Sequence, residues 1–196
     1  MRILVTGFKP FLGATINPSE RLAKELANLF PEVASFILPA EFKNSFEILK
    51  KQVALTKPDY LIMLGQASGR ARVCIEKIGL NWVQTEHRDE AGVQPAAGKI
   101  FSNSSLALMS DFPIDQMYFE LRKQNLPVEI SFSAGTYVCN DLYFRTLKEF
   151  TDLKSVFVHV PLLPEQLDEN DERPSLVFEV QLNILNLLIH SSITSL

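Results

Sequence analysis

A strand, a turn of small residues and the start of a helix follow one another in a single stretch, Val128-Glu129-Ile130-Ser131-Phe132-Ser133-Ala134-Gly135-Thr136-Tyr137-Val138-Cys139-Asn140. Residues 128–132 form an apolar run, which predicts a strand, and apolar residues then recur at helical spacing over 139–150. Ala134 and Gly135 form the turn between them. Cys139 is therefore expected in the first turn of a helix, where unpaired N–H groups and the positive end of the helix dipole lie.

A thiol at this position is a candidate nucleophile, because both features favour the thiolate. We expect iodoacetamide to alkylate Cys139 faster than Cys74, and still at about pH 6, below the range in which a free thiol ionises. The competing interpretation is a small buried core residue, which is the commonest role of a free cysteine. The rest of the chain has to decide between the two.

Length and composition favour one α/β domain over residues 1–196, with a sizeable core, since 46% of the residues are hydrophobic. The net charge is −4 and no basic stripe is present, so nucleic acid is not expected as a partner. Two cysteines are too few for a disulfide framework. The chain shows no signal peptide and no apolar stretch of membrane-spanning length, which together predict a cytoplasmic protein without a membrane partner.

Strand and helix patterns alternate along the chain, and this predicts a mostly parallel sheet covered by helices on both faces. The expected strands are 2–8, 33–38, 60–64, 73–83, 128–132 and 156–160, and the expected helices are 17–29, 42–55, 116–124, 139–150 and 175–193. Residues 84–105 are polar and irregular and predict a long loop or hairpin. Ligands in such sheets bind beyond the carboxyl ends of the strands.

Two further residues that could take part in catalysis are expected near that edge. His159 is the one histidine near the carboxyl end of a predicted strand, and Glu76 lies inside an apolar stretch. Glu76 either faces solvent or, if it is buried, needs a donor such as a histidine or an arginine. Together with Cys139 they would form the nucleophile, base and orienting carboxylate of an acyl-transfer enzyme. The cysteines and histidines lack metal-ligand spacing, so no metal site is expected.

Five motifs in order carry a resemblance to a known family. The motifs are Val5-Thr6-Gly7-Phe8-Lys9-Pro10-Phe11 with Asn17-Pro18-Ser19, Gly65-Gln66-Ala67-Ser68-Gly69-Arg70, Ile75-Glu76-Lys77-Ile78-Gly79-Leu80-Asn81, Ser133-Ala134-Gly135-Thr136-Tyr137-Val138-Cys139-Asn140, and Phe157-Val158-His159-Val160-Pro161 with Pro164-Glu165-Gln166. They resemble the patterns T-G-F-x-P-F, G-x-A-x-G-R, I-E-R-I-A-x-N, S-A-G-x-Y-x-C-N and F-x-H-V-P of pyroglutamyl-peptidase I, also called pyrrolidone-carboxylate peptidase. Members of this family are cysteine peptidases that remove an N-terminal pyroglutamate from peptides.

The resemblance implies a three-layer α/β/α fold with a mixed, mostly parallel sheet, related to the nucleoside phosphorylases. It implies Cys139 as nucleophile, His159 as general base and then acid, and Glu76 as the residue that orients His159. It also implies that no metal or organic cofactor is needed and that the protein is a homo-oligomer, either a dimer or a tetramer.

For the substrate, the resemblance implies that Phe8 and Phe11 enclose the pyroglutamyl ring, with Gln66 near its amide. Tyr137 and Val138, which precede the nucleophile, complete the expected substrate-binding set. The expected substrates are peptides with an N-terminal pyroglutamate.

One departure from the family pattern bears on activity. Glu86 stands where family members carry an arginine near the oxyanion site, and Arg88 is the nearby residue that would replace its charge. This mismatch keeps open a catalytically weak relative that binds lactam-like peptide termini. A nucleoside phosphorylase-like enzyme is a further alternative, disfavoured because the chain has no phosphate-binding loop.

Overall fold

The structure is a computed structural model that describes residues 1–194, with side chains up to residue 190. Fourteen elements follow one another along the chain: β1 Ile3–Phe8, α1 Pro18–Leu29, β2 Val33–Leu38, α2 Asn44–Thr56, β3 Tyr60–Gln66, β4 Val73–Glu76, β5 Ile78–Leu80, β6 Ala107–Met109, α3 Ile114–Lys123, β7 Val128–Ser131, α4 Val138–Glu149, β8 Lys154–Val160, the 3₁₀ turn η1 Pro164–Gln166, and α5 Phe178–Thr194.

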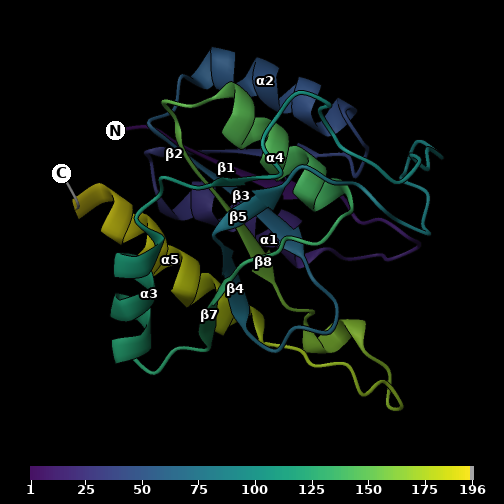
Figure 1. Ribbon diagram of the computed structural model, residues 1–196. Coiled ribbons are helices and arrows are strands. Elements are labelled where there is room, and N and C mark those ends of the chain that lie inside the picture. Colours follow the sequence, from purple (N-terminus) through teal and green to yellow (C-terminus); the bar gives the residue numbers. More distant parts are fainter. Residues whose placement is uncertain (195–196) are drawn as a thin grey trace.

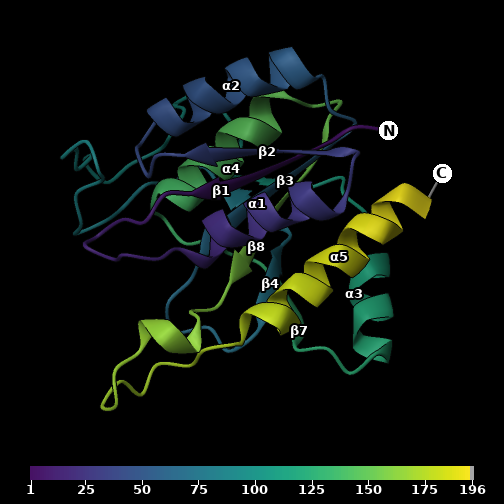
Figure 2. The ribbon, with the colours of Figure 1, turned by 180° about the vertical axis from the view of Figure 1, so that it is seen from behind.

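The central sheet has six strands in the order β2-β1-β3-β8-β4-β7. All neighbouring pairs are parallel except β8 and β4, which are antiparallel. Figures 1 and 2 show helices on both faces, with α2 and α4 on one face and α1, α3 and α5 on the other. The predicted three-layer fold with a mixed, mostly parallel sheet is confirmed.

Alternation along the buried strands divides the core in two. In β1, Ile3 and Val5 pack with the α1, α3 and α5 layer, whereas Leu4 and Phe8 pack with the α2 and α4 layer. The second layer is the one that carries Cys139, so the side chains of the sheet that face α4 are those that can reach the thiol.

The start of α1 follows from local sequence. The side chain of Asn17 accepts a hydrogen bond from the backbone N–H of Ser19 at 3.0 Å and so caps the helix, and Pro18 occupies the first turn. The Ser19 hydroxyl in turn accepts from the N–H of Phe8 at 3.0 Å. The helix is therefore tied to the end of β1 and holds the loop that follows that strand.

Two predictions about the strands are wrong. The apolar stretch 73–83 is two strands, because the chain leaves the central sheet after Glu76 and β5 pairs antiparallel with β6 in a separate two-stranded sheet. In addition, β4 and β7 run opposite to the other four strands, so their carboxyl ends do not lie at the edge where β3 and β8 end. Residues 84–105 are irregular, as expected, with one bridge between Val83 and Gly98. No helix in the part of the chain that the structure describes is long and apolar enough to cross a membrane.

Gly7 is required by the close approach of α1 to β1. A Cβ at Gly7 would lie 2.2 Å from the carbonyl oxygen of Ser19, a backbone atom that cannot rotate away. We expect Gly7→Ala to lower the free energy of unfolding by about 3 kcal/mol, the upper part of the range for overpacking. Urea denaturation followed by circular dichroism measures the effect. Gly98→Ala is the matched control, because a Cβ there meets nothing within 4 Å. Equal midpoints for the two variants would contradict the packing argument.

Candidate active site

Cys139 is the second residue of α4, directly after the turn that leaves β7. The N-cap residue, Tyr137, makes no side-chain cap. In the described part of the chain, the backbone N–H groups of Val138, Cys139 and Asn140 have no acceptor. These groups are therefore available to stabilise negative charge that develops beside the thiol.

His159 and Glu76 meet on the face of the sheet that α4 covers. In the antiparallel pairing of β4 with β8, Glu76 lies opposite Phe157 and Cys74 lies opposite His159, so Glu76 and His159 are diagonal neighbours. Their side chains meet at 2.8 Å between Nδ1 of His159 and Oε1 of Glu76. Glu76 is fully buried and His159 is 5% exposed. The carboxylate holds the proton on Nδ1 and leaves Nε2 as the nitrogen that can accept a proton.

Arg70 supports the buried carboxylate. Its Nη2 atom lies 3.4 Å from Oε1 of Glu76 and donates to the carbonyl of Ser133 at 3.0 Å, and its Nη1 atom lies 3.8 Å from Glu129. A guanidinium in this place offsets the cost of burying a negative charge. Arg70 also joins the loop before Cys139 to the carboxylate that holds His159.

The thiol approaches the sheet at Gly65. A Cβ at this position would lie 3.1 Å from Sγ of Cys139 and 2.7 Å from the ring of Phe157. Gly65 pairs with His159 in the parallel register of β3 and β8. Because Gly65 has no side chain, the Cys139 thiol can lie against β3 next to β8, the strand that carries His159.

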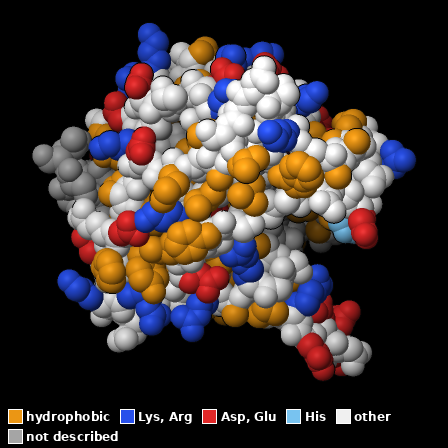
Figure 3. Space-filling model, in the orientation of Figure 1, with side chains coloured by type: hydrophobic (Ala, Val, Ile, Leu, Met, Phe, Trp, Pro, Cys, Tyr) orange, Lys and Arg blue, Asp and Glu red, His pale blue; other side chains and the backbone are white. Residues whose placement is uncertain are grey.

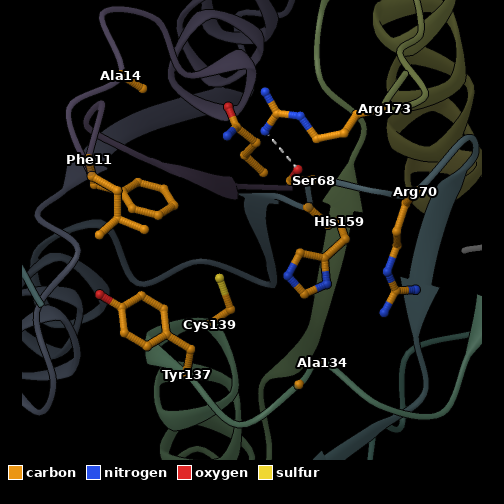
Figure 4. A pocket seen from close by; sticks show the side chains of 13 residues that line it. Phe11, Ala14, Ser68, Arg70, Ala134, Tyr137, Cys139, His159 and Arg173 are labelled. Atoms are coloured by element: carbon orange, nitrogen blue, oxygen red, sulfur yellow. Dashed lines mark hydrogen bonds between the residues drawn. The ribbon is translucent and has the colours of Figure 1, made fainter. Parts of the chain in front are cut away.

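Cys139 and His159 point into one cavity of about 430 Å³ (Figure 4), within the size range of small-molecule sites. In Figure 4, Phe11 and Tyr137 lie on one side of the thiol, and His159, Arg70, Ser68 and Arg173 lie on the other. The lining residues are Phe11, Leu12, Ala14, Gln66, Ala67, Ser68, Arg70, Ala134, Gly135, Tyr137, Cys139, His159 and Arg173. The cavity thus has an aromatic side and a polar side, with the thiol between them.

The structure separates the expected substrate-binding residues into two groups. Phe11, Gln66 and Tyr137 line the cavity. Phe8 and Val138 do not line it: they are 2% and 1% exposed and pack in the core of the α2 and α4 layer. Phe8 ends a buried strand with its ring toward that core, whereas Phe11 belongs to the loop that follows, which explains why the two rings differ.

The charge at Glu86 lies outside the cavity. Glu86 is exposed and is not a lining residue, and the same holds for Arg88, whose Nη1 atom donates to the carbonyl of Gly92 at 2.7 Å. The cations at the cavity are Arg70 and Arg173. In this arrangement neither the Glu86 nor the Arg88 side chain lines the cavity that holds the thiol.

Like Arg70, Asn140 is a polar residue to which the sequence analysis assigned no role. Its fully buried amide donates to the carbonyls of Leu80 and Trp82, each at 2.9 Å, and accepts from the N–H of Leu80 at 2.8 Å. These bonds fasten the start of α4 to the chain after β5. Arg70 and Asn140 both lie within the family motifs quoted above, which is the feature of the sequence that could have identified them.

The surroundings of the half-buried Cys139 thiol work against the expected easy ionisation. Burial, and then the negative charge of Glu76, raises the pKa of the Cys139 thiol to about 12, against a smaller lowering by the residue's own backbone N–H. Burial and the hydrogen bond to Glu129 likewise raise the pKa of Cys74 to about 12. Desolvation thus outweighs the helix terminus. A positive charge nearby, as on a protonated His159, would stabilise the Cys139 thiolate further.

We therefore expect iodoacetamide to label Cys139 slowly at pH 6 and faster as the pH rises toward the alkaline range, because a raised pKa keeps the thiol protonated below it. Cys139 should still react faster than Cys74, since it lines a cavity whereas Cys74 is fully buried. His159→Ala should slow labelling of Cys139 and leave Cys74 unchanged. Mass spectrometry of tryptic peptides after timed labelling reports both sites. Rapid labelling of Cys139 at pH 6 would show that the helix terminus prevails over burial.

The cavity combines the components of covalent acyl transfer. It holds a thiol, an imidazole with one nitrogen fixed by a buried carboxylate, and free N–H groups at a helix start. No group of three or more histidine, cysteine, aspartate or glutamate residues that could hold a metal ion occurs among the described residues.

Comparisons with known sequences agree over almost the whole chain. The family model described as pyroglutamyl peptidase matches residues 1–195. The pyrrolidone-carboxylate peptidase of Thermosipho africanus is 36% identical over 197 residues, covering 97% of this chain and 95% of the relative. That of Thermosipho melanesiensis is 39% identical over 186 residues, covering 91% of this chain and 92% of the relative.

Solved structures agree as well. Pyroglutamyl peptidase I of Bacillus amyloliquefaciens superposes with a TM-score of 0.88 at 30% identity, over 95% of this chain and 93% of that one. Pyrrolidone carboxyl peptidase of Fervidobacterium islandicum gives a TM-score of 0.90 at 31% identity, over 97% of both chains. A mutant pyrrolidone carboxyl peptidase from P. furiosus gives 0.91 at 32% identity, over the full length of both. With its sequence and its fold in agreement, this chain belongs to the pyroglutamyl peptidase family.

Proposed function

We propose that this protein is a cysteine exopeptidase that hydrolyses the bond after an N-terminal pyroglutamate in peptides. The observation that carries the proposal is that Cys139, at the start of α4, lines the same cavity as His159, whose ring is paired with the buried carboxylate of Glu76. Membership of the pyroglutamyl peptidase family supports the same activity.

In the proposed first half-reaction, Nε2 of His159 takes the proton of the Cys139 thiol as the sulfur attacks the carbonyl carbon that joins pyroglutamate to the next residue. General-base help suits a thiol whose pKa is raised to about 12. The free N–H groups at the start of α4 hold the oxyanion. When the C–N bond breaks, His159 returns the proton to the leaving nitrogen, and the shortened peptide departs as an amine.

In the second half-reaction, water attacks the thioester while His159 takes one of its protons. The C–S bond breaks, the sulfur regains a proton, and free pyroglutamate leaves. Glu76 keeps Nδ1 protonated and stabilises the imidazolium that forms in both halves. Burial and the charge of Glu76 favour the neutral thiol, so proton transfer to His159 accompanies the attack, which limits charge separation in the site.

Gln66 is suited to bind a lactam carbonyl. Its Oε1 atom accepts a hydrogen bond of 2.9 Å from Nε2 of Gln166, which also donates to the carbonyl of Ile16 at 3.1 Å. This contact occupies the oxygen of the Gln66 amide and turns its NH₂ group toward an acceptor in the cavity that it lines. Phe11 and Tyr137 on the aromatic side of the cavity would then enclose the flat ring.

Phe11→Ala should raise KM about tenfold with a small change in kcat, because a ring that packs on the lactam stabilises ground state and transition state alike. Phe8→Ala is the contrasting variant: its ring is 2% exposed and packs in the core, so its loss should lower thermal stability instead. Steady-state kinetics and thermal unfolding of both variants separate the two roles. An unchanged KM in Phe11→Ala would remove this ring from the binding site.

The proposal is tested by turnover of pyroglutamyl-aminomethylcoumarin with purified protein, alongside direct binding of the same compound. Turnover supports the peptidase, whereas binding without turnover identifies a relative that only holds blocked peptide termini. Phosphate-dependent cleavage of inosine would instead indicate the phosphorylase-like alternative.

We further propose that residues 1–196 act as one cytoplasmic domain that needs no cofactor and forms a dimer or a tetramer. Exposed hydrophobic side chains support self-association: Leu106, Met109 and Phe119 are 71%, 58% and 63% exposed. Figure 3 shows hydrophobic side chains gathered in a band across one face of the molecule. Sedimentation analysis measures the assembly.

A further inference from the structure

A second cavity of about 390 Å³ adjoins the first and contains neither Cys139 nor His159. The two cavities share four lining residues, Leu12, Ala14, Gln66 and Arg173. Gln66 and Arg173 therefore stand between the cavity that holds the thiol and the second cavity.

The proposed reaction decides which part of a peptide would extend that way. His159 must face the leaving nitrogen to protonate it, so the chain beyond the scissile bond departs on the His159 side of the thiol. Ser68, Arg70 and Arg173 lie on this side in Figure 4, opposite Phe11 and Tyr137.

Arg173 has donors to offer such a chain. Of its five N–H groups, one on Nε and one on Nη2 bind Asp171, and one on Nη1 donates to Oγ of Ser68 at 3.2 Å. The other two have no acceptor in the described part of the chain. Arg70, by contrast, is already shared among Glu76, Glu129 and the Ser133 carbonyl.

The contacts of Arg173 hold its guanidinium at the mouth of the cavity. Asp171, two residues earlier in the chain, accepts hydrogen bonds from the guanidinium of Arg173. These bonds lower the pKa of Asp171 to about 2, so the pair is ionised at neutral pH. Ser68 reaches it from the β3–β4 turn, and Figure 4 draws this bond. A planar group positioned in advance binds a carbonyl oxygen at less entropic cost.

We propose that Arg173 is a specificity-determining residue that binds the main-chain carbonyl oxygen of the residue following pyroglutamate, and that the second cavity receives the peptide beyond it. The inference rests on the proposed function. A neutral carbonyl fits better than a carboxylate, because acidic side chains gather on the same loop, at Asp168, Glu169 and Glu172. Figure 3 shows acidic side chains clustered at the tip of a projection.

The test uses two amides that differ only in this carbonyl. Pyroglutamyl-alanine amide carries it, and pyroglutamyl isopropylamide replaces the carboxamide with a methyl group. Liberated pyroglutamate is measured by chromatography for the wild type, Arg173→Ala, Arg173→Lys and the control Arg122→Ala, whose arginine lies on α3 and lines neither cavity.

We expect Arg173→Ala to lower the ratio of kcat/KM for alanine amide to kcat/KM for isopropylamide by about tenfold, the loss of one hydrogen bond to a charged donor at a partly exposed site. Arg173→Lys should restore part of the ratio, because a lysine keeps the charge but not the planar fork. Arg122→Ala should leave both values unchanged. Thermal unfolding verifies that each variant is folded.

An unchanged ratio in folded Arg173→Ala would overturn the inference, and so would an equal fall for both amides, which would place Arg173 at the reacting centre or in the fold. Failure of the wild-type protein to release pyroglutamate from either amide would instead overturn the proposed function, and the inference with it. The two failures are therefore distinct.

Discussion

Cys139→Ser is expected to lower kcat/KM for pyroglutamyl-aminomethylcoumarin by a factor on the order of 10⁴ while the protein stays folded. The reason is the environment of the side chain. The cavity raises the pKa of even a thiol to about 12, and a hydroxyl is a far weaker acid than a thiol. His159 cannot compensate, since it can accept a proton only from a group that gives one up at modest cost. Fluorescence of the released coumarin measures the loss.

The control is Cys74→Ser, because Cys74 is the only other cysteine in the chain. It donates to Oε1 of Glu129 at 3.0 Å, a bond that a serine hydroxyl can also make, so this variant should retain most of its activity. Wild-type kcat/KM in Cys139→Ser, with or without an effect at Cys74, would show that Cys139 is not the nucleophile.

His159→Ala is expected to lower kcat by about 10³-fold with little change in KM, because general acid–base help of this kind contributes about 10²–10⁴ to a rate. Nδ1 of His159 is held by Glu76 at 2.8 Å, so the ring is oriented before the substrate arrives. Without the ring, the neutral thiol has no acceptor for its proton and the leaving amine has no donor.

Glu76→Gln should cost less, about 10²-fold, because a residue that orients the base contributes less than the base itself. His87→Ala is the matched control, since His87 is exposed on the loop after β5 and lines no part of the cavity. Equal and small effects at Cys139, His159 and Glu76 would contradict a concerted triad.

The first turn of α4 is a feature that the local sequence predicts correctly. A turn of small residues after an apolar strand, followed by apolar residues at helical spacing, predicted a helix beginning near Cys139, and α4 begins at Val138. The same kind of pattern predicted α1 and its cap at Asn17. These signals are local, because they depend on turn geometry and on residues three or four positions apart.

Strand pairing lies beyond such signals. The apolar stretch 73–83 looks continuous, yet the hydrogen-bond partners change after Glu76, and the partners come from residues far away in the chain. The reversed direction of β4 and β7 has the same origin. Glu76 was expected to join Cys139 and His159 at one edge of the sheet, but it reaches His159 diagonally across an antiparallel pair.

The sequence by itself determined the fold class, the family and the candidate catalytic residues, because residue types, short-range spacing and ordered motifs are properties of the chain. Only the tertiary structure decided how these residues act on one another. It brought Glu76 against His159 across 83 positions, placed Phe8 in the core and Phe11 at the cavity, and left Glu86 outside the lining of that cavity. It also set burial and the charge of Glu76 against the expected ionisation of Cys139, because desolvation and the field of a neighbouring carboxylate depend on what surrounds an atom in space and not on its neighbours along the chain.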